Sequence, residues 1–335
     1  CSDARSFRSR IATRDNWMET TSEQADFRLT RLETEMANRR RRIERRLGAL
    51  VADCAESPHQ LQQAMRYSLL AGGKRIRPVV TLMAAGHLGG QEHVALDPAC
   101  AIEMVHTASL ILDDLPCMDD ATLRRGQPAN HRVFGVDTAI LAAMALLNRA
   151  YAVIGNVHGI SHELRLKLID LLANAVGSEG IIGGQMRDLN ENLHWHDAES
   201  LERLHGQKTG ALFVASAETG ARLAGIPEQR LEPIRDFALN LGLAFQTLDD
   251  LLDTSSMASA TGKDVGKDRG KATFVSFLGE SRARLKVSRL IEAAVNALGP
   301  FAPASEPLAQ LAYSLCALPD SAGIAHRAAI ARSNP

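Results

Sequence analysis

Apolar side chains recur at the spacing of an α-helix in one segment after another from Leu61 onward. The segments with this period are 61–71, 78–88, 97–114, 136–155, 162–182, 199–205, 208–224, 229–253 and 281–298. Breaks rich in glycine, proline or aspartate separate them, and the sequence shows neither sustained strand-like alternation nor an internal repeat. We therefore predict an all-α fold, a single bundle of about ten helices whose chemistry faces an internal cavity.

The composition supports a helical core and excludes disorder over most of the chain. Of 335 residues, 45% are hydrophobic and 4% aromatic, and the formal net charge is −1. A disordered chain combines low hydrophobicity with high net charge, so this composition belongs to a globular protein. Alanine and leucine dominate, which favours helices. The length permits two domains, but we expect one all-α domain over 31–335 after a flexible, arginine-rich segment, 1–30.

The N-terminal region differs in character from the rest. Residues 1–46 hold 12 Arg against 8 acidic residues, a balance of +4, so the remainder carries −5. The run Arg39 to Arg42 is interleaved with apolar residues at helical spacing, which predicts an amphipathic helix with a solvated arginine face. Binding to nucleic acid or anionic lipid is the alternative. Two hypotheses stay open for the first residues: Met18 as the natural start, which native peptides upstream of Met18 would exclude, and an organelle transit peptide.

Two further features bear on the cellular setting. The five cysteines are an odd number without a C-x-x-C pair, which favours a reduced environment, and we expect a cytoplasmic protein. The longest uncharged apolar window covers 138–147, whereas a membrane span needs about 18 residues or more. We therefore expect no membrane span, and we expect no nucleic acid among the partners.

Four acidic residues crowd the end of an apolar helix within 106–120. Asp113 and Asp114 close the helix, and Asp119 and Asp120 follow after a proline. Grouped carboxylates repel one another unless a cation neutralises them, and oxygen ligands at this density suit Mg²⁺ or Mn²⁺. The alternative is an acidic helix end in solvent, although acids at a helix C-terminus oppose the helix dipole.

A second acidic group ends another long apolar helix. It consists of Asp249, Asp250 and Asp253, and the i,i+4 spacing of Asp249 and Asp253 places both carboxylates on one face. Two such groups can hold metal ions between them. Because Mg²⁺ keeps waters and is usually completed by substrate phosphates, the two groups predict a phosphorylated or diphosphorylated ligand.

Four glycine-flanked basic turns supply the balancing charge. They lie at 72–78, 124–126, 208–210 and 262–271. Glycine lets the backbone approach an anion, arginine forks onto phosphate oxygens, and lysine supplies a point charge. The turns match neither the phosphate loop of nucleotide-binding proteins nor the dinucleotide-binding fingerprint. Together with the acidic groups, they predict a site for diphosphates between apolar helices.

Taken in order, these motifs resemble the trans-isoprenyl diphosphate synthase family, and most closely its bacterial geranylgeranyl diphosphate synthases of carotenoid pathways. The matching motifs are GGKRIRP at 72–78, DDLPCMD at 113–119, LRRGQPANH at 123–131, GGQMRDL at 183–189, KTG at 208–210, FQTLDDLLD at 245–253 and GKD at 262–264. The resemblance implies an all-α bundle around a deep central cavity and a homodimer. It also implies Mg²⁺, up to three ions, with Mn²⁺ as an alternative cofactor.

The resemblance implies a role for each matched residue. Isopentenyl diphosphate is expected to bind Lys74, Arg77, His106 and Arg125. The allylic diphosphate is expected to bind Arg124, Lys208, Thr209, Gln246 and Lys263. Metal ligands are expected to be Asp113, Asp119, Asp249 and Asp253, and the catalytic set Asp113, Asp114, Asp119, Lys208, Asp249 and Asp250. Gln185 and Asp188 are expected to line the cavity, and a core histidine stays the alternative for His106.

The reaction implied is condensation of isopentenyl diphosphate with dimethylallyl, geranyl or farnesyl diphosphate, which yields geranylgeranyl diphosphate and diphosphate. Ala108 and Ser109 are small and lie about 6–7.5 Å below Asp113 along the helix axis, which leaves room for a longer tail. The alternatives are a farnesyl diphosphate synthase, a class I terpene cyclase and a non-catalytic subunit of a heteromeric synthase.

Overall fold

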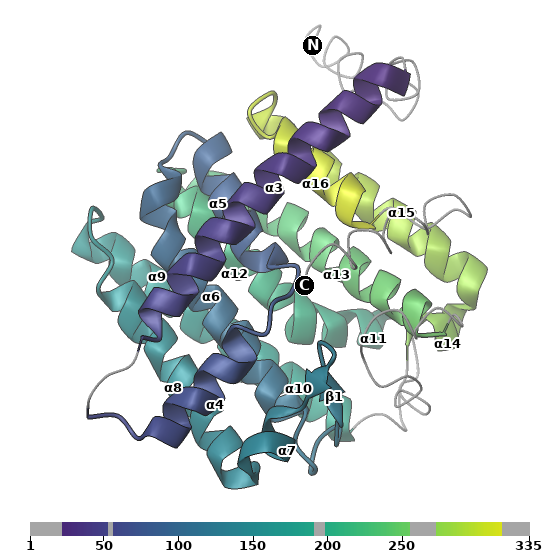
Figure 1. Cartoon of the computed structure of the whole chain (residues 1–335). Helices are drawn as coiled ribbons and strands as arrows, with labels where there is room; N and C mark the ends of the chain where they lie inside the picture. The colour runs from purple at the N-terminus through teal and green to yellow at the C-terminus, as the bar shows by residue number, and fades with distance from the viewer. Residues whose placement is uncertain (1–21, 53–55, 191–197, 255–272, 317–335) are drawn as a thin grey trace, which may run out of the picture.

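The computed structural model describes residues 22–52, 56–190, 198–254 and 273–316, which form a bundle of α-helices (Figure 1). The helices of its first part are α3 (Ser22–Leu50), α4 (His59–Leu69), α5 (Ile76–His87), α6 (Glu92–Asp113), α7 (Asn130–Phe134), α8 (Val136–Gly155), α9 (His162–Val176) and α10 (Ile181–Asn190). Those of its second part are α11 (Ala198–His205), α12 (Ala211–Leu223), α13 (Glu232–Thr254), α14 (Phe274–Leu278), α15 (Glu280–Ala297) and α16 (Glu306–Cys316). The prediction of an all-α bundle is confirmed.

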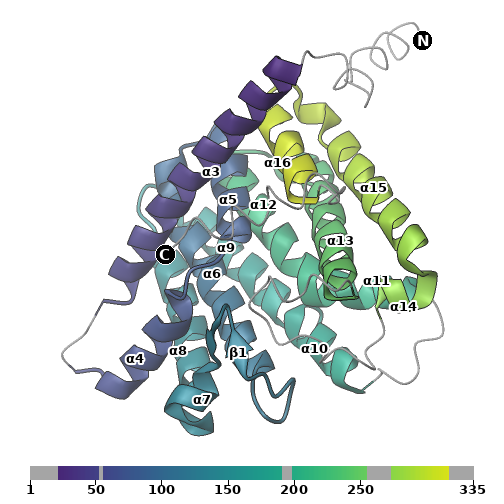
Figure 2. The same ribbon diagram turned by 45° about the vertical axis from the view of Figure 1, so that its right-hand side comes forward.

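Short elements complete the described chain. The strands β1 (Leu123–Arg124) and β2 (Gln127–Pro128) form an antiparallel hairpin. A π-helical turn, η1 (Gly206–Gly210), precedes α12, and two 3-10 turns are η2 (Glu228–Arg230) and η4 (Gly299–Phe301). The hairpin lies at the same end of the bundle as α7 and α10 in both views (Figure 1, Figure 2).

Helix α12 lies at the centre of the bundle, where it contacts α5, α6, α9 and α13. Gly220 permits the approach of α5, because a Cβ at that position would lie 2.4 Å from the backbone oxygen of Thr81. Around this centre α6 packs on α8 and α13 packs on α15. The two helices that end in acidic residues, α6 and α13, therefore both pack against α12.

The observed helices depart from the predicted segments at glycines. The segment 162–182 divides into α9 and α10, because the chain turns between Gly177 and Gly180. The segment 208–224 begins as the π-helical turn η1 rather than as an α-helix. A hydrophobic period persists through a turn of a few residues, so the pattern alone did not show either change.

The arginine-rich helix α3 begins at Ser22, inside the expected N-terminal segment 1–30, and packs on the start of α6. Its buried side chains include Leu32, Ile43 and Leu47, as the amphipathic pattern predicted. The arginines are not all solvated, however. Arg39 lies 2.6 Å and Arg42 2.7 Å from Glu92 of α6. The pair Arg46–Asp97 is also 2.6 Å long, so much of the charge of α3 attaches it to α6.

Helices α6 and α8 are long and apolar enough to cross a membrane by length and composition alone. In α6, 67% of the most apolar stretch is buried inside the bundle, which is typical of a core helix. In α8 the buried share is 39%, because one of its faces carries exposed apolar side chains.

Candidate active site

The first acidic group forms where α6 ends and the chain folds back on itself. The backbone N–H of Asp119 donates to the carbonyl oxygen of Asp113 at 2.9 Å, so the loop returns Asp119 to the helix end. Burial raises the pKa of Asp113 to about 6; Lys208 opposes this shift, and the negative charge of Asp119 adds to it. Asp113 is thus a carboxylate with too little compensating positive charge.

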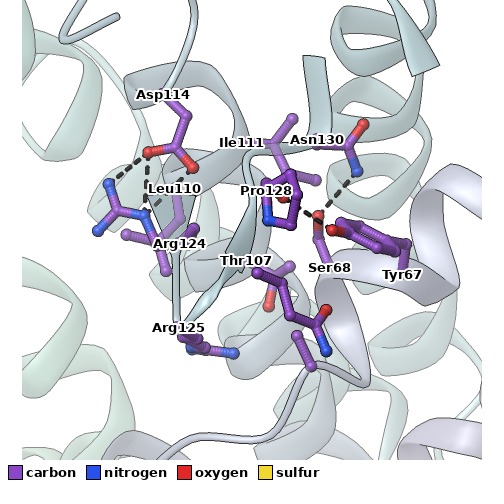
Figure 3. A pocket seen from close by; sticks show the side chains of 12 residues that line it. Tyr67, Ser68, Thr107, Leu110, Ile111, Asp114, Arg124, Arg125, Pro128 and Asn130 are labelled. Atoms are coloured by element: carbon purple, nitrogen blue, oxygen red, sulfur yellow. Dashed lines mark hydrogen bonds and ion pairs between the residues drawn. The ribbon is translucent and has the colours of Figure 1, made fainter. Parts of the chain in front are cut away.

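Asp114 faces another way and is held by a cation of the chain. It is buried, and the Arg124 guanidinium forks onto it, with Nε donating to Oδ1 at 2.9 Å (Figure 3). Burial alone would lower the pKa of Arg124, but the hydrogen bonds and charge of Asp114 outweigh it and raise that pKa. This ion pair lines a small pocket of about 20 Å³ with Thr107 and Ile111, room for one water molecule.

The second acidic group is tied to the π-turn by a chain of hydrogen bonds. Thr209 Oγ1 donates to Gln246 Oε1 at 2.9 Å, and Gln246 Nε2 donates to Asp250 Oδ1 at 2.9 Å. The backbone N–H of Phe274 also donates to Asp250, at 3.4 Å. The Asp250 side chain is therefore buried and held by two hydrogen bonds. Asp249, the preceding residue of α13, is half-buried.

Two predicted residues cannot be placed. Lys263 lies outside the described residues, and Asp253 is described only as part of α13, without its side chain.

The π-turn η1 carries Lys208 and Thr209, and glycines allow neighbouring helices to press against it. A Cβ at Gly184 of α10 would lie 2.6 Å from the backbone nitrogen of Lys208. A Cβ at Gly242 of α13 would lie 3.1 Å from the Cα of Gly210. Wide turns of this kind are often found at functional sites. Here the close approach brings Lys208 Nζ to 2.5 Å from Asp188 of α10.

The predicted isopentenyl pocket collects basic side chains from two turns and from α6. Arg77 Nη1 lies 3.4 Å from His106 Nε2, and the Arg77 guanidinium lies 4.7 Å from the centre of the Phe213 ring. Burial lowers the pKa of Arg77 to about 10, and burial together with the charge of Arg77 lowers the pKa of His106 well below its usual range. Arg125 Nη1 donates to the carbonyl oxygen of Gly72 at 2.6 Å. Lys74 Nζ lies 5.8 Å from the centre of the Phe245 ring.

Acidic and basic residues predicted from the sequence interact electrostatically across the site in two pairs. The negative charge of Asp249 acts on Arg77, and Lys208 acts on Asp113. The structure thus brings together α5, α6, η1 and α13, which are far apart in the sequence.

The small residues before Asp113 differ in their surroundings. Ala108 belongs to the core and is 4% exposed, whereas Ser109 is half-buried. Ser109 Oγ donates to the carbonyl oxygen of His106 at 2.9 Å. At about 100° per residue, Ser109 is turned about 40° from Asp113 and Ala108 about 140°, so Ser109 shares the face of Asp113.

Sequence reasoning missed a buried ion pair behind the basic turns. Arg75 Nη1 lies 2.6 Å from Glu103 Oε1, and both side chains are almost fully buried. The signal was present in the sequence, because Glu103 is an isolated acid in the apolar run 98–112 of α6.

The donor set fits magnesium bound between two helices together with a ligand. Within the described residues, three or more His, Cys, Asp or Glu side chains do not gather closely enough to hold a metal by themselves. The carboxylates are instead divided between α6 and α13, as suits Mg²⁺ completed by water and phosphate oxygens. Gln185 supports a ligand there, since both polar atoms of its side chain are buried without a hydrogen-bond partner among the described residues.

Known proteins resemble this chain over most of its length. A family model described as polyprenyl synthetase matches residues 58–296. Geranylgeranyl pyrophosphate synthase 11, chloroplastic, of Arabidopsis thaliana is 43% identical over 270 residues, which cover 78% of this chain and 76% of that protein. An FPP/GFPP synthase structure from Zymomonas mobilis matches with a TM-score of 0.77 and 33% identity, over 86% of this chain and 99% of that one.

A second solved structure is a geranyltransferase from Helicobacter pylori complexed with magnesium and isoprenyl diphosphate. It matches with a TM-score of 0.76 and 32% identity, over 84% of this chain and 95% of that one. The family match and the shared helical fold identify the chain as a prenyl-transferring enzyme. The chain belongs to the polyprenyl synthetase family, which confirms the family predicted from the sequence.

Proposed function

We propose that the enzyme condenses isopentenyl diphosphate with an allylic diphosphate in a Mg²⁺-dependent reaction and releases geranylgeranyl diphosphate. One observation carries the proposal. The ends of α6 and α13, which both bear carboxylates, share a site with two separate groups of basic side chains. The π-turn with Lys208 forms one basic group, and the pair Arg77 and His106 belongs to the other. Two basic groups suit two diphosphate substrates.

The residues of the chain suit electrophilic alkylation. Asp113, Asp119 and Asp249 would hold Mg²⁺, which would supply Lewis-acid charge to the allylic diphosphate. Lys208, Arg124 and Thr209 stabilise the same negative charge while the carbon–oxygen bond breaks and its electron pair leaves with diphosphate. The isopentenyl alkene then forms the new carbon–carbon bond. Loss of one proton restores a double bond, and the released diphosphate can accept that proton.

The binding of isopentenyl diphosphate needs residues that stay in place before the reaction. Arg77 is packed against the Phe213 ring, and Arg125 is held by the carbonyl oxygen of Gly72. The lowered pKa of His106 favours its neutral imidazole, which can donate or accept a hydrogen bond. These contacts orient one substrate while the acidic groups bind the other.

An elongation assay tests the function. The purified chain is incubated with isopentenyl diphosphate and each allylic primer, with Mg²⁺ and with a chelator, and the products are sized by chromatography. We expect elongation to a twenty-carbon diphosphate with Mg²⁺ and none after chelation. Elongation that persists without divalent metal would contradict the metal requirement, and absence of elongation under all conditions would contradict the function.

The twenty-carbon product rests on relatives and on one position of α6. The Arabidopsis relative is named for geranylgeranyl diphosphate and the Zymomonas neighbour for other products, so the product length is a proposal. Ser109 is small and shares the face of Asp113, which leaves space for a growing tail. A farnesyl diphosphate synthase stays the alternative.

Replacing Ser109 by phenylalanine is expected to shift the product towards farnesyl diphosphate, because an aromatic ring would fill the space one helical turn below Asp113. Chromatography of the product diphosphates measures the shift. Ser109→Ala is the matched control, since it stays small and should keep the longer product. The same product distribution from Ser109→Phe as from the wild type would defeat the role of this position. Ala108 is less suitable, because a large side chain there would disturb the core.

We also propose that the enzyme is a homodimer joined through α8. Four apolar side chains are exposed on this helix: Val136, Ile140, Leu141 and Met144. A contiguous apolar face of this kind marks an interaction surface. Sedimentation equilibrium of the wild-type chain measures whether the mass exceeds the 36.2 kDa of one chain.

A further inference from the structure

Glu103 is a buried acid that lies between the two basic turns of the isopentenyl pocket. It is 1% exposed and lies on α6, three residues before His106. Its Oε1 is 2.6 Å from Arg75 Nη1 and 3.8 Å from Arg125 Nη2. One carboxylate thus contacts the turn at 72–78 and the hairpin turn at 124–126, which are separated by about fifty residues of chain.

The side chain of Arg75 is buried beneath the turn at 72–78. Arg75 precedes the first residue of α5 with a left-handed backbone, φ +50°, and it is 2% exposed. Its Nη2 donates to the carbonyl oxygen of Leu69 at 2.7 Å. The side chain of Arg75 therefore attaches this turn to α4 and α6, while its neighbours Lys74 and Arg77 contact the aromatic rings of the site.

Arg125 joins the same arrangement from the hairpin. Its Nη1 donates to the carbonyl oxygen of Gly72, and a Cβ at Gly73 would lie 3.0 Å from its guanidinium carbon. Glycine at 73, with φ +126°, leaves the room that the guanidinium needs. Arg125 is thus fixed by the backbone of the other turn and by the charge of Glu103.

The charge of Glu103 also favours the charged forms of the nearby arginines. Burial lowers the pKa values of Arg77 and Arg125, and the negative charge of Glu103 acts in the opposite direction on both. A fully buried guanidinium such as that of Arg75 is strongly destabilising without an acidic partner, and Glu103 is that partner.

We propose that Glu103 is a positioning residue for isopentenyl diphosphate, which acts through Arg75 and Arg125 and does not touch the diphosphate itself. The inference rests on the proposed function, since it assigns the pocket of Arg77, His106 and Arg125 to that substrate. Glu103 sets the distance between the two basic turns, and so the spacing of the groups that grip the ligand.

Removal of Glu103 has two opposing effects on binding. A more positive pocket attracts a diphosphate more strongly, whereas a free Arg75 disturbs the turn that presents Lys74 and Arg77. The second effect is larger, because Arg75 is almost fully buried and must leave its position once its partner is neutral. The net result is weaker binding.

Steady-state kinetics of Glu103→Gln test the proposal against a matched control. Glu218→Gln changes another buried glutamate, paired with Arg222 and Arg235 at 2.7 Å each, at the other end of α12 from η1. Both variants are expected to lower the unfolding temperature. Only Glu103→Gln is expected to raise the KM for isopentenyl diphosphate, by about tenfold, the size of a lost charge-assisted contact. The KM for the allylic primer and kcat are expected to stay within about twofold of the wild type.

Three outcomes would overturn the inference. They are an unchanged or lower KM for isopentenyl diphosphate in Glu103→Gln, an equal rise in the KM of both substrates, and the same rise in Glu218→Gln. If the single variant fails to fold, Arg75→Gln/Glu103→Gln removes both buried charges and carries the same expectation. A wild-type chain that does not elongate would contradict the proposed function instead, which keeps the two failures distinct.

Discussion

Replacing Asp113 by asparagine is expected to lower kcat at least about a thousandfold, the scale set by losing a preorganised electrostatic group. Asp113 closes α6 beside Asp119 and within reach of the charge of Lys208, and burial raises its pKa to about 6. The charged form of this carboxylate is therefore one that a bound cation would stabilise. Asparagine keeps the shape and removes the negative charge that the proposed binding of magnesium diphosphate requires.

The same substitution is expected to preserve or raise the unfolding temperature without magnesium. A raised pKa means that the folded state binds the proton of Asp113 more tightly than the unfolded chain does. The stability contributed by the neutral form is present at low pH and is lost as the pH rises through about 6. A neutral side chain avoids that loss at pH 7, so activity and stability should move in opposite directions.

Asp120→Asn is the matched control for Asp113→Asn. Asp120 belongs to the same acidic run but is exposed, and it pairs with Arg132 at 3.2 Å. We expect its kcat to stay within about twofold, because exposed ion pairs contribute little. Circular dichroism melting and product formation at saturating substrate measure both quantities. Asp113→Asn with more than a tenth of wild-type kcat would contradict the assigned role.

Replacing Gly184 by alanine is expected to lower kcat by about a hundredfold, the cost of displacing reacting groups by about 1 Å. The added Cβ would lie 2.6 Å from the backbone nitrogen and 2.9 Å from the Cα of Lys208. Backbone cannot rotate away as a side chain can, so α10 and the π-turn must separate. The contact of Lys208 with Asp188 would lengthen with them.

Gly206→Ala is the control, because its Cβ would meet only Leu239 Cδ1, at an ordinary 3.7 Å. It adds the same methyl group to the π-turn itself, at a position without a clash, and alanine is the better helix former. Stopped-flow measurement of the first turnover would separate the chemical step from product release. Equal kcat values for the two alanine variants would show that the approach of α10 to the π-turn is unimportant.

The fold could be predicted because its determinants are periodic. Apolar residues such as Ile43 and Leu47 recur at helical spacing and are buried where that spacing places them. The acidic groups could also be found, since several aspartates at a helix end are rare and chemically costly. Arg124 and Lys208 could be found because each lies in a short basic turn beside a glycine.

The contacts between distant segments could not be predicted from the sequence. The π-turn depends on Gly184 of α10 and Gly242 of α13, and the local sequence does not show that these two glycines pack against it. The pair Arg75–Glu103 joins positions 28 residues apart. Such pairings depend on tertiary packing, which a single sequence does not encode in any local pattern.

The pairs Arg124–Asp114 and Lys208–Asp188 give the site a form of ligand discrimination. Each cation already has a carboxylate partner, so an anion that binds there must displace a negative charge. A bare phosphate offers nothing to the displaced carboxylate. A diphosphate that arrives with its metal offers positive charge to that carboxylate while its oxygens take the arginine or lysine. For the proposed substrates, this exchange of partners is expected to favour metal-loaded diphosphates over the free inorganic anions around the protein.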